Sequence, residues 1–498
     1  MATSSDEEKN KRTDAVSPDS SPDAKVPLHE STPQSPPTPP NGGLGAWLCV
    51  LGAFFIFTNT WGITASFGAF QSYYITTLPE SASSISWIGS IQSFLVVFVG
   101  IVSGPLFDRG YIRILMATGC FLIVFGTMML SLSTKYYQVI LSQGIVIGLG
   151  AGLVYIPALA IISTQFTTKR PFAIGCASSG SSIGGIIFPI MFRRLEPKVG
   201  FGWAVRAIGF ISLGTLAVSL AILSRHKRPK SATKRALFDF KAFTELPFLG
   251  FAVSLLLIFV AFYIPLFYIP SYAIYSLKID ETLSFYLLAI TNSGSFFGRT
   301  VPFLIANRVG SIQIFVFWIV AAVIVMFSWL GIHNEAGFIV FCIIWGFISG
   351  VLVTAPAAAV AHPTLSPSMS VIGTRLGMSW ITAAIGILIG PPIAGALVDL
   401  NTDYFVKAIV FAGVVMAAGA QPPPEIKRCI SRYTTPHDWE LADFNNIYST
   451  NAANAPIYRV ATSSTPPEPD FQSPPWQLDD FTAVQNGIIP PPQLPRKN

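Results

Sequence analysis

The chain has 498 residues, of which 51% are hydrophobic and 11% are charged, and its formal net charge is +6. A soluble domain carries about 25% charged residues, so this composition excludes an ordinary soluble protein. The apolar residues fall in blocks of about 20, and each block is long enough to cross a hydrocarbon core as a helix. We therefore expect an all-α polytopic membrane protein. In such a protein, lysines and arginines in the loops indicate which loops face the cytoplasm. The positive net charge therefore gives no indication of nucleic-acid binding.

The blocks divide the chain into two similar halves. Residues 1–43 are rich in Ser, Pro, Asp and Lys, a composition typical of a disordered tail. The predicted spans lie at 46–70, 85–106, 111–132, 137–163, 171–192, 203–224, 248–274, 284–306, 311–332, 336–360, 371–398 and 404–420. The longest break between spans is a basic loop at 225–247, so we expect one six-helix bundle at 44–224 and another at 248–420. The Pro-rich segment 421–498 is a second predicted disordered tail, and the last span before it is unusually short.

Lysines and arginines predict the orientation. With both tails in the cytoplasm, the inner loops carry 13 of these cations and the outer loops carry seven. The positive-inside rule favours this arrangement. The stretch RRLEPKVGFGWAVR at 193–206 is a basic outer loop that the rule does not explain. We take the plasma membrane as the predicted location, with an internal membrane as the alternative.

A weak repeat relates the two halves. WAVRAIGF at 203–210 opens the sixth span and YFVKAIVF at 404–411 opens the twelfth. Likewise, GPLFDRG at 104–110 ends the second span and FLIANRVG at 303–310 ends the eighth. Motifs at corresponding positions indicate parallel halves related by an axis along the membrane normal. This architecture is typical of secondary transporters, whose substrate site lies between the halves near the membrane midplane.

Four motifs carry a resemblance to a known family. NGGLGAW at 41–47 and FTTKRPFAIGCASSGSSIGG at 166–185 resemble two motifs of the monocarboxylate-transporter family, within the major facilitator superfamily. WGITASFGAFQSYY at 61–74 resembles its fungal branch, and GPLFDRGYIR at 104–113 resembles the superfamily's loop between spans 2 and 3. The resemblance covers about residues 41–420. It implies the major facilitator fold and transport of a small organic molecule by alternating access, but it implies no particular substrate.

The chain also departs from that family. The first motif normally begins with an acid, and here it begins with Asn41. The mammalian lactate carriers have a lysine in span 1, whereas no Lys or Arg lies between Trp47 and Tyr74. They also have an aspartate where this chain has Ser295, four residues before Arg299. These losses favour export of a larger, less polar organic acid or secondary metabolite. Proton-linked uptake of a short monocarboxylate is the alternative.

Arg299 is the first candidate for a substrate-binding residue. An arginine inside an apolar span costs at least about 2.5–3.5 kcal/mol on insertion scales. Asn292 and Ser295 stand seven and four residues earlier, so the three share one helix face. We expect this face to line the cavity, with Arg299 meeting a carboxylate or another electron-rich oxygen. The alternative is that Arg299 snorkels toward the nearby cytoplasmic end of its helix.

Further candidates come from other spans. FTNTWG places Asn59 and Trp61 near the middle of span 1, where an amide and an indole are expected to face the cavity. Tyr155, Gln92 and Trp380 are additional candidates for the cavity lining. Simple packing or interfacial anchoring is the alternative for the aromatic residues among them.

Asp108 and Arg109, which close span 2, are candidates for a conformational latch. The resemblance implies a contact between helix ends that stabilises the outward-facing state. Its expected partner is the beginning of span 11 near Arg375, where the helix dipole favours the Asp108 carboxylate. The alternative is a simple cytoplasmic cap and topology signal.

The chain contains no pattern typical of an enzyme, a metal site or a cofactor site. Its five cysteines have no paired spacing, and no GxxxxGK[ST] loop is present to indicate direct ATP drive. No carboxylate lies deep in a span, so proton coupling would fall to acids in loops, and His362 is expected to be a loop residue. The expected partners are a small organic substrate and the lipid bilayer. An organic anion as the substrate and protons as a further partner are left open. A membrane sensor that has kept the fold and lost transport is left open as an alternative function.

Overall fold

The computed structural model describes residues 42–166, 169–225, 239–304, 311–360, 362, 364–366, 371–399 and 405–421. Both predicted tails and most of the predicted central loop lie outside these ranges. The described part is built from helices joined by short connections, and this confirms the predicted fold class.

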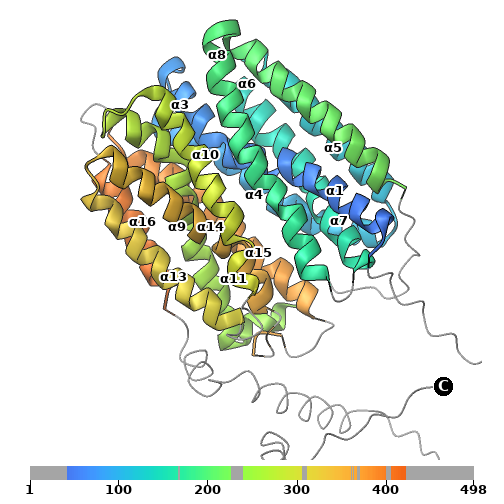
Figure 1. Cartoon of the computed structure of the whole chain (residues 1–498). Helices are drawn as coiled ribbons and strands as arrows, with labels where there is room; N and C mark the ends of the chain where they lie inside the picture. Colours follow the sequence, from blue (N-terminus) through green and yellow to red (C-terminus); the bar gives the residue numbers. More distant parts are fainter. Residues whose placement is uncertain are drawn as a thin grey trace, which may run out of the picture. The chain divides into compact units, whose positions relative to one another are not determined.

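The first half contains α1 to α8 (Figure 1). The bounds are α1 (Leu44–Asn59), α2 (Trp61–Ala65), α3 (Phe67–Thr77), α4 (Ala82–Asp108), α5 (Ile112–Leu130), α6 (Tyr136–Val139), the π-helix η1 (Ile140–Ile147), α7 (Gly148–Gln165) and α8 (Arg170–Leu223). The second half begins with the 3₁₀-helix η2 (Phe240–Thr244) and α9 (Leu246–Tyr275). It continues with α10 (Glu281–Gly298), α11 (Val301–Leu304), α13 (Ser311–Ser328), the 3₁₀-helix η3 (Trp329–Gly331), α14 (Glu335–Val360), α15 (Ile372–Leu397) and α16 (Val406–Gly419).

The described helices agree with the twelve predicted crossings. Nine helical segments within the described ranges are long and apolar enough to cross a membrane. One of them is α8, whose 54 residues would reach far beyond a single hydrocarbon core, so α8 contains two crossings. The other two crossings are α10, which is more polar, and α16, which has only 14 residues.

The predicted loop between spans 5 and 6 is wrong. Residues 193–199 and 201–202 are helical, and the chain reverses at Gly200 between them, whose φ of 77° lies in the left-handed region. A Cβ on Gly200 would meet no atom within 4 Å, so the glycine is required by its backbone conformation and not by space. The two crossings of α8 therefore meet at a single sharp turn (Figure 1).

Span 1 is longer than predicted and is interrupted twice. It extends over Leu44–Thr77, with breaks at Thr60 and Ser66. The Thr60 hydroxyl donates to the Ile56 carbonyl at 2.8 Å, and the Ser66 hydroxyl donates to the Gly62 carbonyl at 2.7 Å. Such bonds compete with the helical pattern and bend helices. The break at Thr60 places Trp61 at the start of a new short helix.

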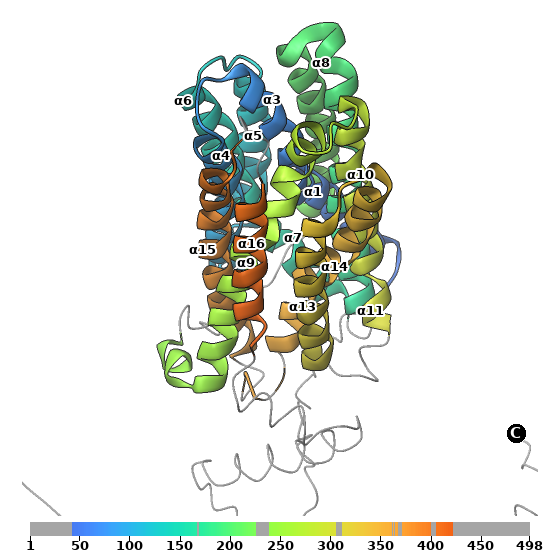
Figure 2. The same cartoon turned by 90° about the vertical axis from the view of Figure 1, so that its left-hand side faces the viewer.

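Small residues allow the helices to approach closely. The glycine-rich part of α8 packs against α1, where a Cβ on Gly180 would collide with the Phe54 carbonyl. In the second half, a Cβ on Gly390 of α15 would collide with the Val260 carbonyl of α9. Backbone contact of this kind drives helix association in lipid, because lipid tails are as apolar as leucine. Figure 2 shows α9, α15 and α16 side by side in the second half.

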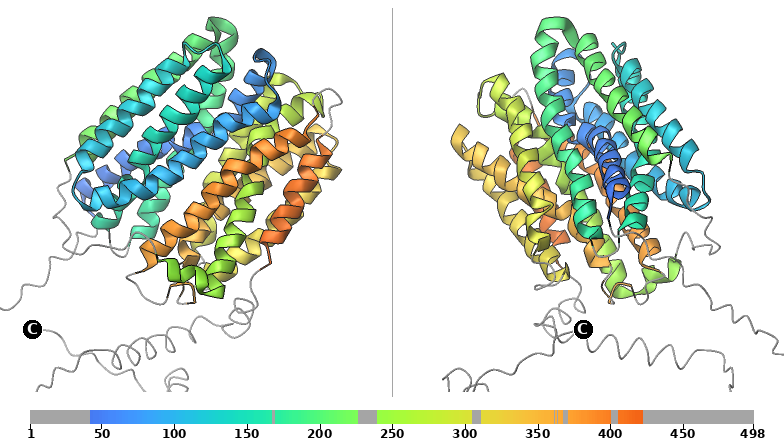
Figure 3. Two further views of the ribbon diagram at one scale, coloured as in Figure 1. Left: turned by 180° about the vertical axis from the view of Figure 1, so that it is seen from behind. Right: turned by 45° about the vertical axis from the view of Figure 1, so that its right-hand side comes forward.

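Within the described residues, the two halves meet mainly along three helix pairs. α4 packs against α15, α3 against α9, and the first crossing of α8 against α10. In Figure 3 the first-half helices, blue to green, lie beside the second-half helices, yellow-green to orange. We call the end of the bundle where α1 begins the near end, and the end where α8 turns at Gly200 the far end.

Candidate substrate site between the halves

Arg299 directs its side chain from the second half toward the first. It follows the last residue of α10, and its Nη1 donates to the Ser178 carbonyl at 3.0 Å and to the Ser181 hydroxyl, both on α8. Its Nε is buried and has no hydrogen-bond partner among the described residues. The guanidinium thus keeps its Nε donor unused at the interface between the halves.

Two tyrosines from other helices lie near this guanidinium. The hydroxyls of Tyr155 on α7 and Tyr263 on α9 lie within electrostatic range of the Arg299 guanidinium. The Tyr155 ring meets the edge of Trp61 at a centroid distance of 5.5 Å and that of Phe57 at 5.4 Å. The structure therefore brings together three predicted residues, Arg299, Tyr155 and Trp61. Tyr263 joins them and was not predicted.

No carboxylate among the described residues balances the charge of Arg299. Its hydrogen-bond partners in the described part of the chain are a main-chain carbonyl and a serine hydroxyl. A cation in a low-dielectric interior is unfavourable unless an opposite charge compensates it. The site is therefore electrostatically suited to an anion that brings its own hydrogen-bond acceptors.

Asn292 and Ser295 lie along the same helix but contact different neighbours. The Asn292 amide donates to the Gly185 carbonyl of α8 at 3.2 Å and to the Leu288 carbonyl at 2.9 Å. Asn292 thus faces α8, as Arg299 does. Ser295 is buried, and its carbonyl lies against Gly350 of α14. The structure places Asn292 on the interface of the halves and the Ser295 backbone inside the second half.

Asn59 stands apart from the group around Arg299. Its amide nitrogen donates to the Phe55 carbonyl and to the Thr215 hydroxyl, each at 2.8 Å, and Thr215 belongs to the second crossing of α8. The contacts of Asn59 are therefore within the first half. Its Oδ1 is buried without a hydrogen-bond partner among the described residues.

Two other candidates for the cavity lining have mainly local contacts. Gln92 is fully buried, and its Nε2 donates to the Thr64 hydroxyl at 3.4 Å. The Trp380 ring packs on Phe259 of α9 at a centroid distance of 5.4 Å. The structure does not bring either of them into described contact with Arg299. His362 lies in a bend after α14, where its Nδ1 accepts from the Thr364 amide at 3.3 Å.

Arg375 is buried in a charge cluster that the sequence did not reveal. Its Nη2 donates to Glu245 at 2.7 Å and to Asp239 at 3.2 Å, and its Nη1 donates to the Leu365 carbonyl at 2.7 Å. The guanidinium also lies over the Phe248 ring. Both acids belong to the segment that the sequence analysis treated as a basic loop. Arg375 therefore fastens the end of that segment and the start of α9 to α15.

The predicted partner of Asp108 is thus engaged elsewhere. Asp108 ends α4 and is partly buried, and Arg109 beside it is exposed. α4 does pack against α15, the helix that carries Arg375. The described ion pairs of Arg375 are nevertheless with acids of its own half. A latch through Asp108 and Arg109 stays a prediction.

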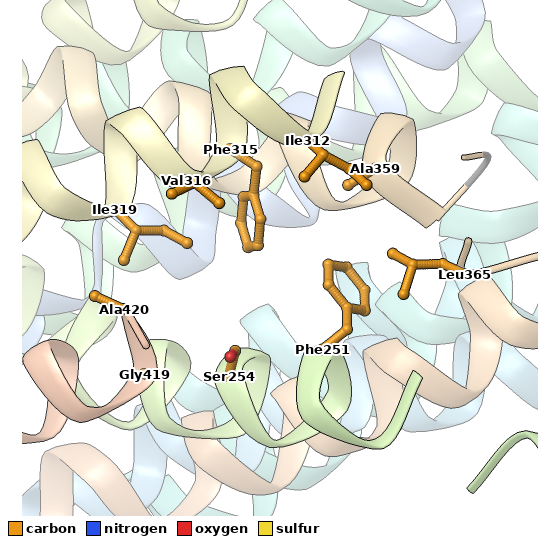
Figure 4. A pocket seen from close by; sticks show the side chains of 10 residues that line it. All are labelled: Phe251, Ser254, Ile312, Phe315, Val316, Ile319, Ala359, Leu365, Gly419 and Ala420. Carbon is orange, nitrogen blue, oxygen red and sulfur yellow. The ribbon is translucent and has the colours of Figure 1, made fainter. Parts of the chain in front are cut away.

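A small pocket lies inside the second half, and Arg299 is not among the residues that line it (Figure 4). It is lined by Phe251, Ser254, Ile312, Phe315, Val316, Ile319, Ala359, Leu365, Gly419 and Ala420. The lining is apolar except for Ser254, so it offers no recognition of charge. Gly419 and Ala420 form the end of the short α16, and we interpret the pocket as a packing gap at that end.

Helical crossings in two packed halves, with a buried cation at their interface that has no carboxylate partner in the described part of the chain, are the arrangement expected of a secondary transporter. The sequence matches the profile of the Major Facilitator Superfamily over residues 49–391, and the chain belongs to this superfamily. The predicted superfamily is therefore confirmed. The finer assignment to the monocarboxylate-transporter family is not part of this match.

The relatives include fungal transporters. The chain is 40% identical over 389 residues to the MFS-type transporter dbaD of Emericella nidulans, and the match covers 76% of this chain and 87% of that protein. It is 37% identical over 411 residues to the aspyridones efflux protein apdF of the same fungus, covering 81% and 83% of the two chains. Among solved structures, a point mutant of the nucleoside transporter NupG aligns with a TM-score of 0.58 at 16% identity, covering 75% of this chain and 98% of NupG. That likeness shows the fold alone.

Proposed function

We propose that this protein exports an organic acid or another acidic secondary metabolite by alternating access. The observation that carries the proposal is the Arg299 guanidinium, held at the interface of the halves with an unused donor and no described carboxylate partner. A relative at 37% identity is named as an efflux protein for aspyridones. Both observations fit a cargo that carries an anionic or strongly electron-rich oxygen.

The surroundings of Arg299 favour a cargo larger than lactate. Trp61, Tyr155 and Tyr263 offer ring faces and edges that suit a conjugated or cyclic body. The acid and the span 1 lysine of the mammalian lactate carriers are absent from this chain. Within the monocarboxylate-transporter type, we therefore place this protein with exporters and not with uptake permeases for short acids.

Orientation and coupling belong to the same proposal. We place both tails in the cytoplasm and the protein in the plasma membrane, on the strength of the cation distribution between the loops. The near end then faces the cytoplasm and takes up cargo, and the far end releases it. Protons are the proposed coupling ion, with acids outside the spans as their carriers.

The test is flux in proteoliposomes with labelled benzoate as the bulky anion and labelled lactate as the short one. We expect saturable transport of benzoate that exceeds lactate transport, and a loss of at least about tenfold in Arg299→Gln, because a charge-assisted hydrogen bond contributes about 1.5–3 kcal/mol. Arg113→Gln is the matched control, since Arg113 is an exposed cation whose Nε donates to the Ser224 carbonyl.

Three outcomes would contradict the proposal. Equal benzoate flux in wild type and Arg299→Gln would remove Arg299 from the site. Transport of lactate in preference to benzoate would favour the uptake permease. Binding of benzoate without any flux of either acid would indicate a sensor with a transporter fold.

A further inference from the structure

A buried hydrogen-bonded junction joins the halves at the far end. The Tyr268 hydroxyl on α9 lies 2.6 Å from the Ser86 hydroxyl on α4 and 3.4 Å from the Pro391 carbonyl on α15. One turn nearer the far end, the Ser83 hydroxyl donates to the Pro392 carbonyl at 2.8 Å. Tyr268, Ser86 and Ser83 therefore tie α4 of the first half to α9 and α15 of the second.

Unsatisfied polar groups line this junction. Gln71 on α3 is fully buried; its Oε1 accepts from the Ser86 hydroxyl at 3.4 Å, while its Nε2 has no partner among the described residues. Ser90 lies one turn along α4 from Ser86, and its hydroxyl is also buried without a described partner. Buried polar groups in native proteins are normally paired, so these two indicate a surface that is wet in another conformation.

Two glycines allow the junction to close. A Cβ on Gly395 of α15 would lie 2.5 Å from the Tyr268 hydroxyl and 2.7 Å from the Ser83 Cα. A Cβ on Gly68 of α3 would collide with the Leu266 carbonyl of α9. In both places a main chain or side chain of one half touches a glycine of the other. Any larger residue would hold the halves apart.

A second set of contacts lies at the rim of the same end. Arg193 on α8 pairs with Glu281 of α10 at 2.9 Å and lies over the Phe285 ring at 5.4 Å. Arg194 donates from Nε to the Tyr286 hydroxyl at 2.8 Å. Both cations belong to the basic stretch that the positive-inside rule left unexplained. Their contacts cross between the halves, which gives them a role other than topology.

We propose that these contacts form one gate at the far end, closed in this conformation, and that Gln71, Ser86 and Ser90 line the release route when it opens. Tyr268 is the central closing residue, and Arg193 and Arg194 are rim contacts of smaller effect, since exposed ion pairs contribute little. The unsatisfied donors of Gln71 and Ser90 then hydrogen-bond to water and to oxygen atoms of the departing cargo. This assignment does not depend on what Arg299 binds, but its direction of release rests on the proposed orientation, with both tails in the cytoplasm of a plasma-membrane protein.

The test measures access to the junction without any cargo. Ser90→Cys is introduced as a reporter, and its labelling by a membrane-impermeant maleimide is measured in cells, with the same chain lacking the reporter as background. Ser90 is fully buried here, so we expect slow labelling in the otherwise wild-type protein. Adding Gly68→Ala or Gly395→Ala should raise the labelling rate at least about fivefold, the population shift that corresponds to losing about one hydrogen bond.

Two control variants and one variant without added bulk separate opening of the gate from a general effect on the labelling rate. Gly45→Ala and Gly214→Ala should leave labelling unchanged, because a Cβ at either position would meet nothing within 4 Å. Tyr268→Phe removes only the hydroxyl and should raise labelling without steric conflict, whereas Arg193→Gln should change it less than about twofold. Unchanged labelling in Gly68→Ala, Gly395→Ala and Tyr268→Phe, or an equal rise in the control variants, would overturn the gate.

Discussion

The proposed role of Arg299 rests on a hydrogen-bond donor of its guanidinium that has no partner among the described residues. Two of its hydrogen bonds go to α8, yet Nε is buried and unused among the described contacts. A buried donor without a partner is unfavourable by about 1–3 kcal/mol, and more for a charged group. A bound anion would satisfy it. Serine partners hold the side chain in place without neutralising its charge, which a carboxylate would do.

Tyr263 is the second residue of the proposed site for which we make a prediction. Its hydroxyl lies within electrostatic range of Arg299 and Tyr155. Tyr263→Phe keeps the ring and removes the hydroxyl, so we expect the KM for benzoate to rise about fivefold with little change in folded yield, as for the loss of about one hydrogen bond to cargo. Benzoate flux over a concentration series checks this. Tyr73→Phe, a change on the far-end segment of α3, is the control, and an equal KM in wild type and Tyr263→Phe would contradict the prediction.

The sequence predicted the proposed site in part, for a clear physical reason. Arg299 is conspicuous because a cation inside an apolar span is costly, and that signal needs no knowledge of packing. Tyr263 lies in the run FVAFYIPLFYIP, where one aromatic residue looks like the next. Asn59 was equally conspicuous, but its amide turns toward Thr215 within the first half. Packing decides which neighbouring helix each face of a helix contacts. The type of residue at one position does not predict this.

At the scale of elements, the charge cluster around Arg375 fixes the start of α9 to the start of α15. The Arg375 side chain is 3% exposed, while those of Asp239 and Glu245 are 23% and 41% exposed. An arginine in the first turn of a helix is opposed by the helix dipole, so these acids are what stabilises it there. The last part of the predicted basic loop is therefore a structural element of the second half.

Substitutions in this cluster should affect stability unequally. Arg375→Gln leaves two partly exposed carboxylates without their cation and removes the contact with Leu365, so we expect a loss of about 1–3 kcal/mol, as for losing charge-assisted hydrogen bonds. Asp239→Asn should have a much smaller effect, because the Asp239 carboxylate is partly solvated and Glu245 remains. Thermal unfolding of the purified protein in detergent, followed by size-exclusion chromatography, compares the two. A melting temperature for Arg375→Gln equal to that of Asp239→Asn would be inconsistent with this account.

The elements themselves were mostly predictable, because each span must be apolar over about 20 residues. The failures have local causes. The loop predicted at 193–202 contains Arg, Leu, Glu and Lys, which favour helix, and Pro197 and Gly200 within it did not reveal that the helix breaks at Gly200 alone. The breaks of span 1 at Thr60 and Ser66 depend on hydroxyl bonds to the preceding turn. A hydropathy profile cannot predict helix breaks that depend on such hydrogen bonds.

At the scale of the whole transporter, the described polar contacts between the halves form two groups, one at the far end and one nearer the middle. At the far end they are hydrogen bonds and ion pairs through Tyr268, Ser83 and Arg193. Nearer the middle, Arg299 and Asn292 reach α8 from α10. For transport, the far-end contacts must break so that cargo can leave. Arg299 and Asn292 must exchange their hydrogen bonds with α8 for hydrogen bonds with cargo. The basic stretch at the far end, unexplained as a topology signal, fits this arrangement.

The most direct test of the central claim, that Arg299 receives an anion between the halves, is equilibrium binding of benzoate and its neutral counterpart benzamide by scintillation proximity. The two ligands have nearly the same shape and differ in charge. We predict that the wild-type protein binds benzoate at least about tenfold more tightly than benzamide, and that Arg299→Gln binds both alike. Equal affinity of the wild type for the two ligands, or an undiminished preference for benzoate in Arg299→Gln, would contradict the account.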